Sequence, residues 1–370
     1  MDLTGLDVPA DNELEIVVFG PGFGECILLH IGSNKWIVVD SCKDSVSKKP
    51  VALEYLESIG IEPSSAVIMV LVTHWHDDHI RGIPEILEEC PEALIAVSQA
   101  ATVDQFIQYV TLLNTNNELK GSNGVREYAK LLAMLAERGV ECKKACADRR
   151  LLQIPSCDLS HGGTCDIWSL APSDTQIDQI NHSIAALFPT HGDSKPRAIP
   201  NEPNNTSAVV QILIGDLGVL LGGDLEETSN PSTGWTAIVE STARPTVKCE
   251  VFKIPHHGSK NANNDDVWSD MLTPSNLAVV TPFNKGKTRL PTPDDKSRIV
   301  AKTANAYLTQ AIPGGKRTRP KMVEKTLRDS GKSLRTIKKT MGFVRLRRQL
   351  GESAPVDWDV LCRGGATKLG

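Results

Sequence analysis

Long apolar runs are missing from this 370-residue sequence. None approaches the roughly 20 residues that a membrane-spanning helix needs. The first residues, Met1 to Glu15, are acidic and lack the basic start and apolar centre of a secretory signal peptide. The nine cysteines are an odd number scattered along the chain, which argues against a disulfide framework. We therefore expect a cytoplasmic protein without a membrane segment.

Zinc knuckles of the usual spacing are also missing. Cys142, Cys146, Cys157 and Cys165 lie close together in sequence, with His161 between the last two. Their spacing matches no common structural zinc site. Ordinary buried or surface thiols are the simpler interpretation, and a second zinc site is the alternative.

Basic charge is concentrated near the end of the chain. From Lys316 to Arg348 the sequence has thirteen Lys or Arg and two acids, which is +11 in 33 residues, and the whole chain carries −5. A basic tract on an acidic body predicts contact with phosphates or with an acidic protein partner, and a solvated basic surface is the alternative. Its only aromatic residue is Phe343, so base stacking is not expected from it. The residues predicted to bind nucleic acid are Lys316, Arg317, Arg319, Lys321, Arg335, Lys338 and Lys339.

Runs rich in Ile, Val and Leu predict short strands with helices between them. We expect strands at 14–19, 25–31, 36–39, 66–72, 93–97, 166–171, 207–214, 219–222, 250–254, 277–281, 343–346 and 358–361. We expect helices at 47–59, from residue 84, at 174–188 and at 294–304, and a helical insertion over 101–139 packed outside the sheets. This order fits two packed sheets covered by helices on both faces. Residues 1–312 would form the catalytic domain, and residues 313–370 a basic extension that adds strands to it.

The most informative segment runs from Thr73 to Gly82. It places three histidines and two aspartates within six positions, directly after the apolar run 66–72. A buried strand followed by such a loop brings imidazole and carboxylate groups together, and these are the ligands of zinc, manganese or iron. A His-rich surface loop is the alternative.

Candidate ligands follow four separate strands of the predicted sheets. Asp40 follows one strand and Asp224 another, and the pair His256-His257 follows a third. With the segment 73–82, all four stand after apolar runs. Sheet ends of this kind are where sites are usually built.

The pattern H-x-H-x-D-H-x-x-G resembles the signature of the metallo-β-lactamase fold superfamily, and the order of the other elements is similar. The resemblance implies an α/β (α+β) fold of the αββα sandwich type, with two mixed β-sheets flanked by helices. It implies one or two divalent metal ions, Zn²⁺ or Mn²⁺. Asp224 would bridge them, and Asp40 would orient the loop or reach the metals through water. The implied metal ligands are His74, His76, Asp78, His79, Asp224 and either His256 or His257.

One departure from the family pattern concerns the first metal. Many members with two metals have a further histidine before the late hairpin, where this chain has Asn204, Asn205, Thr206 and Ser207. His161, His182 and His191 are available elsewhere, but none follows a convincing strand. The sequence therefore predicts either one tightly held metal or two with one loosely held.

A narrower resemblance is to the metallo-hydrolase domain of bacterial DNA-uptake competence proteins (ComEC-type), over about residues 14–310. It rests on the Gly-rich segment 19–29, the Asn205-Thr206-Ser207 start of the late hairpin, the Gly223-Asp224 end of it, and the run 255–260. The resemblance implies a phosphodiesterase, most simply a nuclease, with Asp78 and Asp224 in catalytic roles.

The chemistry next to the site agrees with a phosphodiester substrate. Ser259 and Lys260 offer a hydroxyl and an ammonium group to a phosphate, although Lys260 is also read as an ordinary exposed lysine. Asn205, with these two residues and Asp40, forms a predicted secondary site. The alternatives are a hydrolase of a small lactone, thioester or cyclic nucleotide on the same fold, and a partner-gated module with little activity alone.

Overall fold

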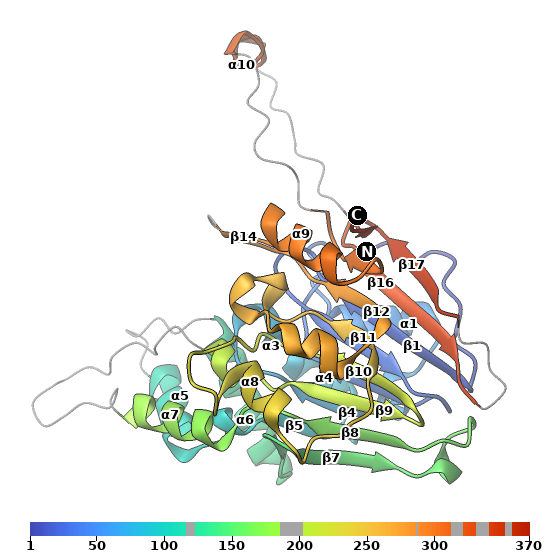
Figure 1. Cartoon of the computed structure of the whole chain (residues 1–370). Helices are drawn as coiled ribbons and strands as arrows, with labels where there is room; N and C mark the ends of the chain where they lie inside the picture. The colour runs from blue at the N-terminus through green and yellow to red at the C-terminus, as the bar shows by residue number, and fades with distance from the viewer. Residues whose placement is uncertain (116–122, 186–202, 286–287, 312–320, 331–339, 352–356) are drawn as a thin grey trace, which may run out of the picture.

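The computed structural model describes residues 1–115, 123–185, 203–285, 288–311, 321–330, 340–351 and 357–370. Two mixed β-sheets pack face to face, and helices cover the outer face of each (Figure 1). This is the αββα sandwich, so the predicted fold class is confirmed.

The first sheet has the strand order β17-β16-β1-β2-β3-β4-β5-β6 within the described residues. Strands β3 to β6 are parallel, and the strands from β17 to β3 are antiparallel. Its strands are β1 (Glu13–Phe19), β2 (Cys26–His30), β3 (Trp36–Val39), β4 (Val67–Val72), β5 (Leu94–Ser98), β6 (Lys143–Ala145), β16 (Phe343–Gln349) and β17 (Asp359–Arg363).

The second sheet has the order β18-β15-β12-β11-β10-β9-β8-β7 in the part of the chain that is described. Strands β10, β11, β12 and β15 run parallel, so their carboxyl ends lie at one edge. Its strands are β7 (Arg149–Ile154), β8 (Cys165–Ser169), β9 (Val210–Ile214), β10 (Leu217–Leu221), β11 (Cys249–Lys253), β12 (Leu272–Val280), β15 (Ala306–Leu308) and β18 (Thr367–Lys368). A separate hairpin pairs β13 (Phe283–Lys285) with β14 (Thr288–Leu290).

The helices divide between the two outer faces, with α1 and α4 against the first sheet and α8 and α9 against the second (Figure 1). The small helix α10 lies away from both sheets (Figure 1). The helices are α1 (Val51–Ser58), α2 (Pro63–Ala66), α3 (Asp77–Ile80), α4 (Ile83–Glu89), α5 (Asp104–Thr115), α6 (Asn123–Arg138), α7 (Asp174–Ala185), α8 (Gly234–Glu240), α9 (Pro293–Lys302) and α10 (Lys321–Asp329). Across the described residues, no helix is both long enough and apolar enough to span a membrane.

Successive side chains of each strand point to opposite faces of its sheet, and together they form three layers of hydrophobic core. In β1, Val17 and Phe19 face the helices of the first sheet, whereas Ile16 and Val18 face the second sheet. Both sets are fully buried, as expected for strands covered on both faces. A third core lies between the second sheet and its helices, around Trp235.

The C-terminal residues 343–349 and 359–363 complete the first sheet, because β16 pairs with β1 along its whole length. Their basic residues are used in this packing. Arg345 contacts Asp7, and Arg347 pairs with Glu15, which is fully buried. These arginines of the predicted basic tract therefore hold the sheet together.

Several predicted boundaries are wrong. The helix expected at 47–59 begins at Val51, because Pro50 fits only at the start of a helix and the side chain of Asp44 accepts hydrogen bonds from Val46 and Ser47 in a turn. The strand expected from 207 begins at Val210. The predicted strands do not include β6, β7, β15, β18 or the β13–β14 hairpin. The insertion forms α5 and α6, and its residues 116–122 lie outside the described part.

Candidate metal centre

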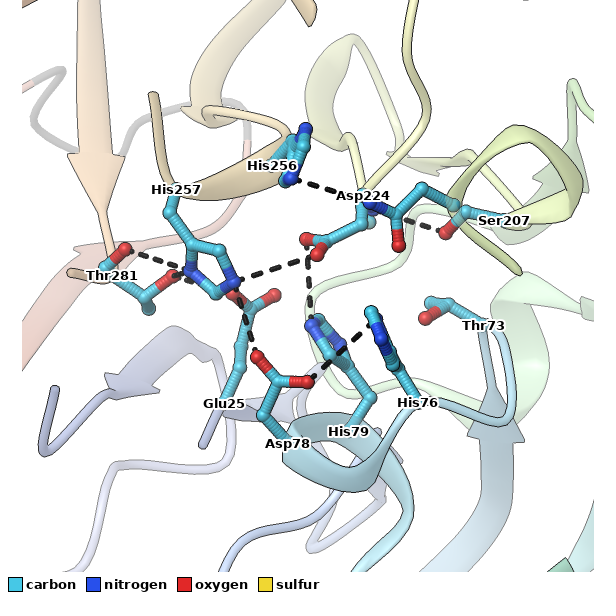
Figure 2. A network of polar contacts seen from close by, with 12 residues as sticks. Glu25, Thr73, His76, Asp78, His79, Ser207, Asp224, His256, His257 and Thr281 are labelled. Atoms are coloured by element: carbon cyan, nitrogen blue, oxygen red, sulfur yellow. Dashed lines mark hydrogen bonds and ion pairs between the residues drawn. The ribbon is translucent and has the colours of Figure 1, made fainter. Parts of the chain in front are cut away.

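The centre lies where strands of the two sheets end. Asp40 follows β3, and His74 and His76 follow β4, its parallel neighbour. The one-turn helix α3 then carries Asp78 and His79. From the second sheet, β10 leads to Asp224 and its parallel neighbour β11 leads to His257. Parallel pairing brings the residues of each sheet together, and the packing of the two sheets brings both sets to one point, as Figure 2 shows.

Two groups of ligand atoms share Asp224. One contains His74, His76 and Asp224, and the other contains Asp78, His79, Asp224 and His257, with all ligand atoms of a group within 4.8 Å of one another. Every member except His76 is buried. The arrangement predicts two neighbouring metal positions with Asp224 between them.

Orphaned polar atoms support this assignment. Among the described residues no hydrogen-bond partner is found for His74 Nε2. His79 Nε2, His257 Nε2, Asp78 Oδ2 and Asp224 Oδ1 face one another at 3.2–3.4 Å as ion pairs and make no hydrogen bond of good geometry. Buried polar atoms are rarely left without partners, since each such atom costs about 1–3 kcal/mol. Imidazole nitrogens and carboxylate oxygens that converge in this way fit divalent metal ions.

Hydrogen bonds on the far side of each ring set its direction. His79 Nδ1 lies 2.7 Å from Asp40 Oδ2, and His257 Nδ1 lies 3.0 Å from the Thr281 carbonyl oxygen. His74 Nδ1 lies 3.0 Å from Thr73 Oγ1. In all three residues Nε2 is thereby left facing the centre, as is usual for metal-binding histidines, whose other ring nitrogen makes a hydrogen bond.

Asp40 holds the loop after β4 through hydrogen bonds. Its carboxylate accepts hydrogen bonds from the Thr73 amide (2.7 Å) and the Thr73 hydroxyl (2.6 Å) and also contacts His79. Asp40 is one member of a further group with His74 and His79. Three donors already occupy its two oxygens, so we assign it to fixing the loop after β4.

The backbone at these positions is strained. Asp40 and His257 have φ values of 57° and 54°, and His256 has 44°. Non-glycine residues with positive φ cost about 1–3 kcal/mol each and concentrate at functional sites. Gly223 also has a positive φ of 51°, and a Cβ there would lie 2.4 Å from Ser207 Oγ, which accepts the amide hydrogen of Asp224. Glycine is therefore required immediately before the shared carboxylate.

The charges of the centre are coupled. Burial alone would lower the pKa of His257, but the carboxylates of Asp224 and Asp78 outweigh it and raise the pKa to about 9. Burial is likewise outweighed at His79, whose pKa is raised well above its usual range by Asp224 and Asp40. The same contacts hold the pKa of Asp78 and of Asp224 below the usual range, against the effect of burial. Without a metal, two imidazolium groups thus compensate the buried carboxylates.

A second buried charge pair lies behind His257. Lys253 forms an ion pair with Glu25, and both side chains are buried completely. Lys253 Nζ also donates to the Gly223 carbonyl (3.2 Å), next to Asp224, and Glu25 accepts from the hydroxyl of Thr281 (2.5 Å). The pair therefore supports both residues that the second sheet contributes to the centre.

The sequence does not show whether His256 or His257 would bind the metal. In the structure the two side chains have different contacts. Figure 2 shows the His257 ring directed at Asp78 and Asp224. His256 instead has Nδ1 3.1 Å from Glu226 and Nε2 3.2 Å from the Asn204 amide. His256 belongs to neither ligand group.

The residues of the predicted secondary site have separate contacts in the structure. Asn205 contributes its backbone carbonyl to Gln176. Ser259 lines a small apolar pocket with Trp235 and Trp268, and Lys260 is exposed. Of the predicted nucleic-acid-binding residues, Lys316, Arg317, Arg319, Arg335, Lys338 and Lys339 lie outside the described part of the chain, as does the side chain of Lys321.

No third histidine completes the first position within the described residues. His161 contacts the Ile31 carbonyl and the Gly163 amide, and His182 is exposed on α7. His191 is not among the described residues. Ser207, in the segment where the family pattern has the additional histidine, has its Oγ 3.5 Å from His74 Nδ1. The four cysteines 142, 146, 157 and 165 do not appear in any group of converging ligands in the described ranges.

Sequence reasoning missed the supporting residues. Thr73, Thr281, Glu25 and Lys253 are ordinary residue types at strand ends or inside strands, and nothing in their spacing marks them. The one available signal was a lysine within an apolar strand, since Lys253 is flanked by Phe252 and Ile254 and a buried lysine requires a charged partner.

Taken together, the two sheets and their covering helices define the αββα sandwich as the fold class, with a cluster of His and Asp side chains at its strand ends. Residues 19–103, less than a quarter of the chain, match the Metallo-beta-lactamase superfamily. This stretch contains the segment 73–82, and the predicted resemblance to the superfamily is confirmed for this domain.

Solved metallo-β-lactamases are similar to the chain at low identity. The Cronobacter sakazakii enzyme with the HARLDQ motif has 10% identity, covers 66% of this chain and 77% of its own, and has a TM-score of 0.33. SMB-1 bound to 2-mercaptoethanesulfonate has 14% identity, coverage of 67% and 81%, and a TM-score of 0.33. The class B3 di-zinc enzyme LRA-12 from an Alaskan soil metagenome has 12% identity, coverage of 60% and 65%, and a TM-score of 0.31. No curated protein matches the sequence.

Proposed function

We propose that the protein is a metal-dependent phosphodiesterase that cleaves nucleic acid. The observation that carries the proposal is the pair of ligand groups that share Asp224. Their donors are imidazole and carboxylate groups without cysteine, a set that suits Zn²⁺ and Mn²⁺ equally. Two adjacent ions match the demands of phosphodiester hydrolysis, in which both the attacking and the leaving oxygen carry charge.

The two positions would be held by different numbers of residues. His74, His76 and Asp224 would hold one ion, and Asp78, His79, Asp224 and His257 the other. Ions in a centre of this kind act as Lewis acids toward a phosphoryl group and make water a stronger nucleophile at neutral pH.

The protein's own side chains would orient the water and hold the metal ligands in place. Asp78 is ionised and lies with Oδ2 3.2 Å from His257 Nε2 and Oδ1 3.9 Å from His76 Nδ1, so a carboxylate that would hold the four-residue position can also orient water between the two groups. Asp40 and the Thr281 carbonyl fix the rings of His79 and His257. Fixed ligands of this sort reduce the reorganisation that the reaction would otherwise require.

Cleavage of end-labelled nucleic acid tests the proposal. Single- and double-stranded DNA and RNA are incubated with Mn²⁺, Mg²⁺ or Zn²⁺, and wild type is compared with Asp224→Asn, which keeps the shape of the residue and removes its charge. We expect metal-dependent cleavage that falls by at least about 100-fold in the variant, since a shared ligand serves both positions. Equal cleavage by the two proteins, or none with any metal, would refute the proposal.

A further inference from the structure

A pocket of about 340 Å³ opens beside the centre. Its walls come from the β1–β2 loop (Gly22 and Phe23), from the segment after β3 (Lys43 and Lys48), from Arg81 and from Asn284. With Pro21, Asp44 and Ser45 the pocket has nine lining residues, of which three are basic and one is acidic. Neither the predicted site residues nor the basic tract of the sequence includes any of them.

The pocket shares its walls with the centre. Arg81 directly follows α3, the helix that carries Asp78 and His79. On the other side, the Phe23 ring lies 5.7 Å from the Phe283 ring, which lies 5.2 Å from the ring of His257. The amide of Glu25, two residues after Phe23, donates to the Asp78 carbonyl (2.8 Å). The rings of Phe23 and Phe283 thus connect the pocket to His257 on one side, and Arg81 connects it to α3 on the other.

The pocket carries uncompensated positive charge. Lys43 is paired with Glu85, and the Asp44 carboxylate is occupied by the Met1 amino group and two backbone amides. Arg81 and Lys48 have no acidic partner in the described ranges, and Lys48 Nζ contacts only the Ser45 carbonyl there. From the β13–β14 hairpin, Lys285 lies over the Phe23 ring at 4.0 Å and 3.8 Å from Asp77.

We propose that this pocket binds the phosphate group next to the scissile phosphodiester of a nucleic-acid strand, with Arg81 as its principal contact. The inference rests on the proposed function and adds a substrate-positioning residue to it. An arginine without a carboxylate partner presents a planar fork that suits phosphate oxygens, and Lys48 adds charge beside it. Holding a neighbouring phosphate would place the scissile one at the metal centre.

Binding without metal tests the pocket separately from catalysis. The full-length protein in chelator is titrated with a short fluorescein-labelled single-stranded oligothymidylate, and with the same probe carrying a neutral methylphosphonate backbone. The proteins are wild type, Arg81→Gln, Lys48→Gln and Lys143→Gln, the last on the edge strand β6, where the side chain is exposed. Thermal unfolding and metal content establish that each variant is folded.

We expect Arg81→Gln to weaken binding of the charged probe about tenfold and to reduce the salt slope of log K by about one. Lys48→Gln should have a smaller effect in the same direction, and Lys143→Gln none. The neutral probe should bind all four proteins equally. A wild-type affinity and salt slope in Arg81→Gln would overturn the inference.

Cleavage with metal separates failure of the pocket from failure of the proposed function. In the loaded enzyme, Arg81→Gln should raise KM by about tenfold while kcat changes little, as expected when ground-state and transition-state binding are lost together. Cleavage with an unchanged KM would refute the pocket and leave the nuclease proposal intact. Arg81-dependent binding by a protein that cleaves nothing would refute the nuclease and support the pocket as a phosphate site.

Discussion

At the scale of single residues, two adjacent histidines have different environments. His257 faces Asp78 and Asp224, whereas His256 faces Glu226 and Asn204. We predict that His257→Gln lowers metal affinity by at least about 100-fold, because the four-residue group loses a ligand. His256→Gln is the matched control and should change affinity by less than about threefold. Calorimetric titration with Mn²⁺ or Zn²⁺ measures both, and equal losses in the two variants would contradict the assignment.

Metal affinity should depend on pH because His79 and His257 must lose a proton before they can bind a metal. The pKa of His257 is raised to about 9 and that of His79 well above its usual value, and a metal binds only the neutral ring. Affinity should therefore rise with pH by about tenfold per unit for each proton displaced. Calorimetry in two buffers of different ionisation enthalpy counts these protons. An affinity that is constant between pH 7 and 9 would contradict the charge assignment.

The raised pKa of His257 predicts the opposite pH dependence for the stability of the metal-free protein, which should fall as pH rises. The folded pKa of His257 lies above its ordinary value of 6.5, so protonation stabilises the folded state fully below about pH 6.5. That stability is lost as pH rises through about 9. Urea unfolding in chelator should show the decline, and His257→Gln should flatten it. A metal-free stability that rises over this range would refute the account.

The buried pair of Lys253 and Glu25 should be sensitive to removal of one partner. Lys253→Met leaves the Glu25 carboxylate buried without its counter-charge, which costs about 3–5 kcal/mol of unfolding free energy. The double variant Lys253→Met with Glu25→Gln should recover most of this loss. Urea unfolding of the single and double variants measures the difference, and additive losses would show that the two charges do not stabilise each other.

At the scale of elements, helix α6 approaches the metal-binding loop very closely. A Cβ on Gly124 would lie 2.3 Å from the Trp75 carbonyl oxygen, between His74 and His76, and the Gly124 amide donates to Asp77 (2.5 Å). The Trp75 ring also packs on Phe106 of α5, with 4.4 Å between ring centroids. The insertion therefore supports the loop that carries the first two ligands.

Gly124→Ala should consequently displace this loop. We predict a loss of about 1–3 kcal/mol in unfolding free energy together with a weaker first metal position. Ala133→Gly, at an exposed position of α6, is the control: it should cost about 1 kcal/mol through helix propensity and leave metal affinity unchanged. Chemical unfolding and metal titration report the two effects. Unchanged metal affinity in Gly124→Ala would refute the supporting role.

The strands also show how much of the fold and of the metal centre can be predicted from the sequence. The apolar runs before Asp40, His74 and Asp224 located the strand ends, because burial on both faces gives strands a nearly continuous apolar pattern. The choice between His256 and His257 could not be made, since it depends on two successive residues with positive φ. Strand β7 begins with two exposed arginines and β6 with two exposed lysines, so neither shows the apolar pattern of a strand.

The C-terminal basic tract shows a second limit of prediction from the sequence, which concerns charge. Arg345, Arg347 and Arg348 counted toward its charge, yet in the structure they pair with acids of the first 15 residues, of β17 and of β11. Net charge along a sequence does not reveal which basic residues are compensated by distant acids. The free positive charge beside the centre comes instead from scattered single residues, with Arg81 the closest along the chain to the ligands.

At the scale of the whole molecule, the centre joins the two sheets. His74, His76, Asp78 and His79 come from the first sheet, and Asp224 and His257 from the second. A metal that binds only the folded protein stabilises it by about 2.7 kcal/mol at 100 times Kd, which is roughly 3 °C in Tm for a chain of this length. Chelator should remove this increment from wild type and have almost no effect on Asp224→Asn, as measured by scanning calorimetry. Equal shifts in both proteins would place the metal elsewhere.

The central claim is that two unequal metal positions share Asp224, and equilibrium dialysis with Mn²⁺ or Zn²⁺ tests it most directly. The account predicts two ions per chain. The position with four protein ligands should be tighter than the one with three, and His76→Gln should abolish only the weaker. Binding of no ion, or two ions of unchanged affinity in both His76→Gln and His257→Gln, would contradict it.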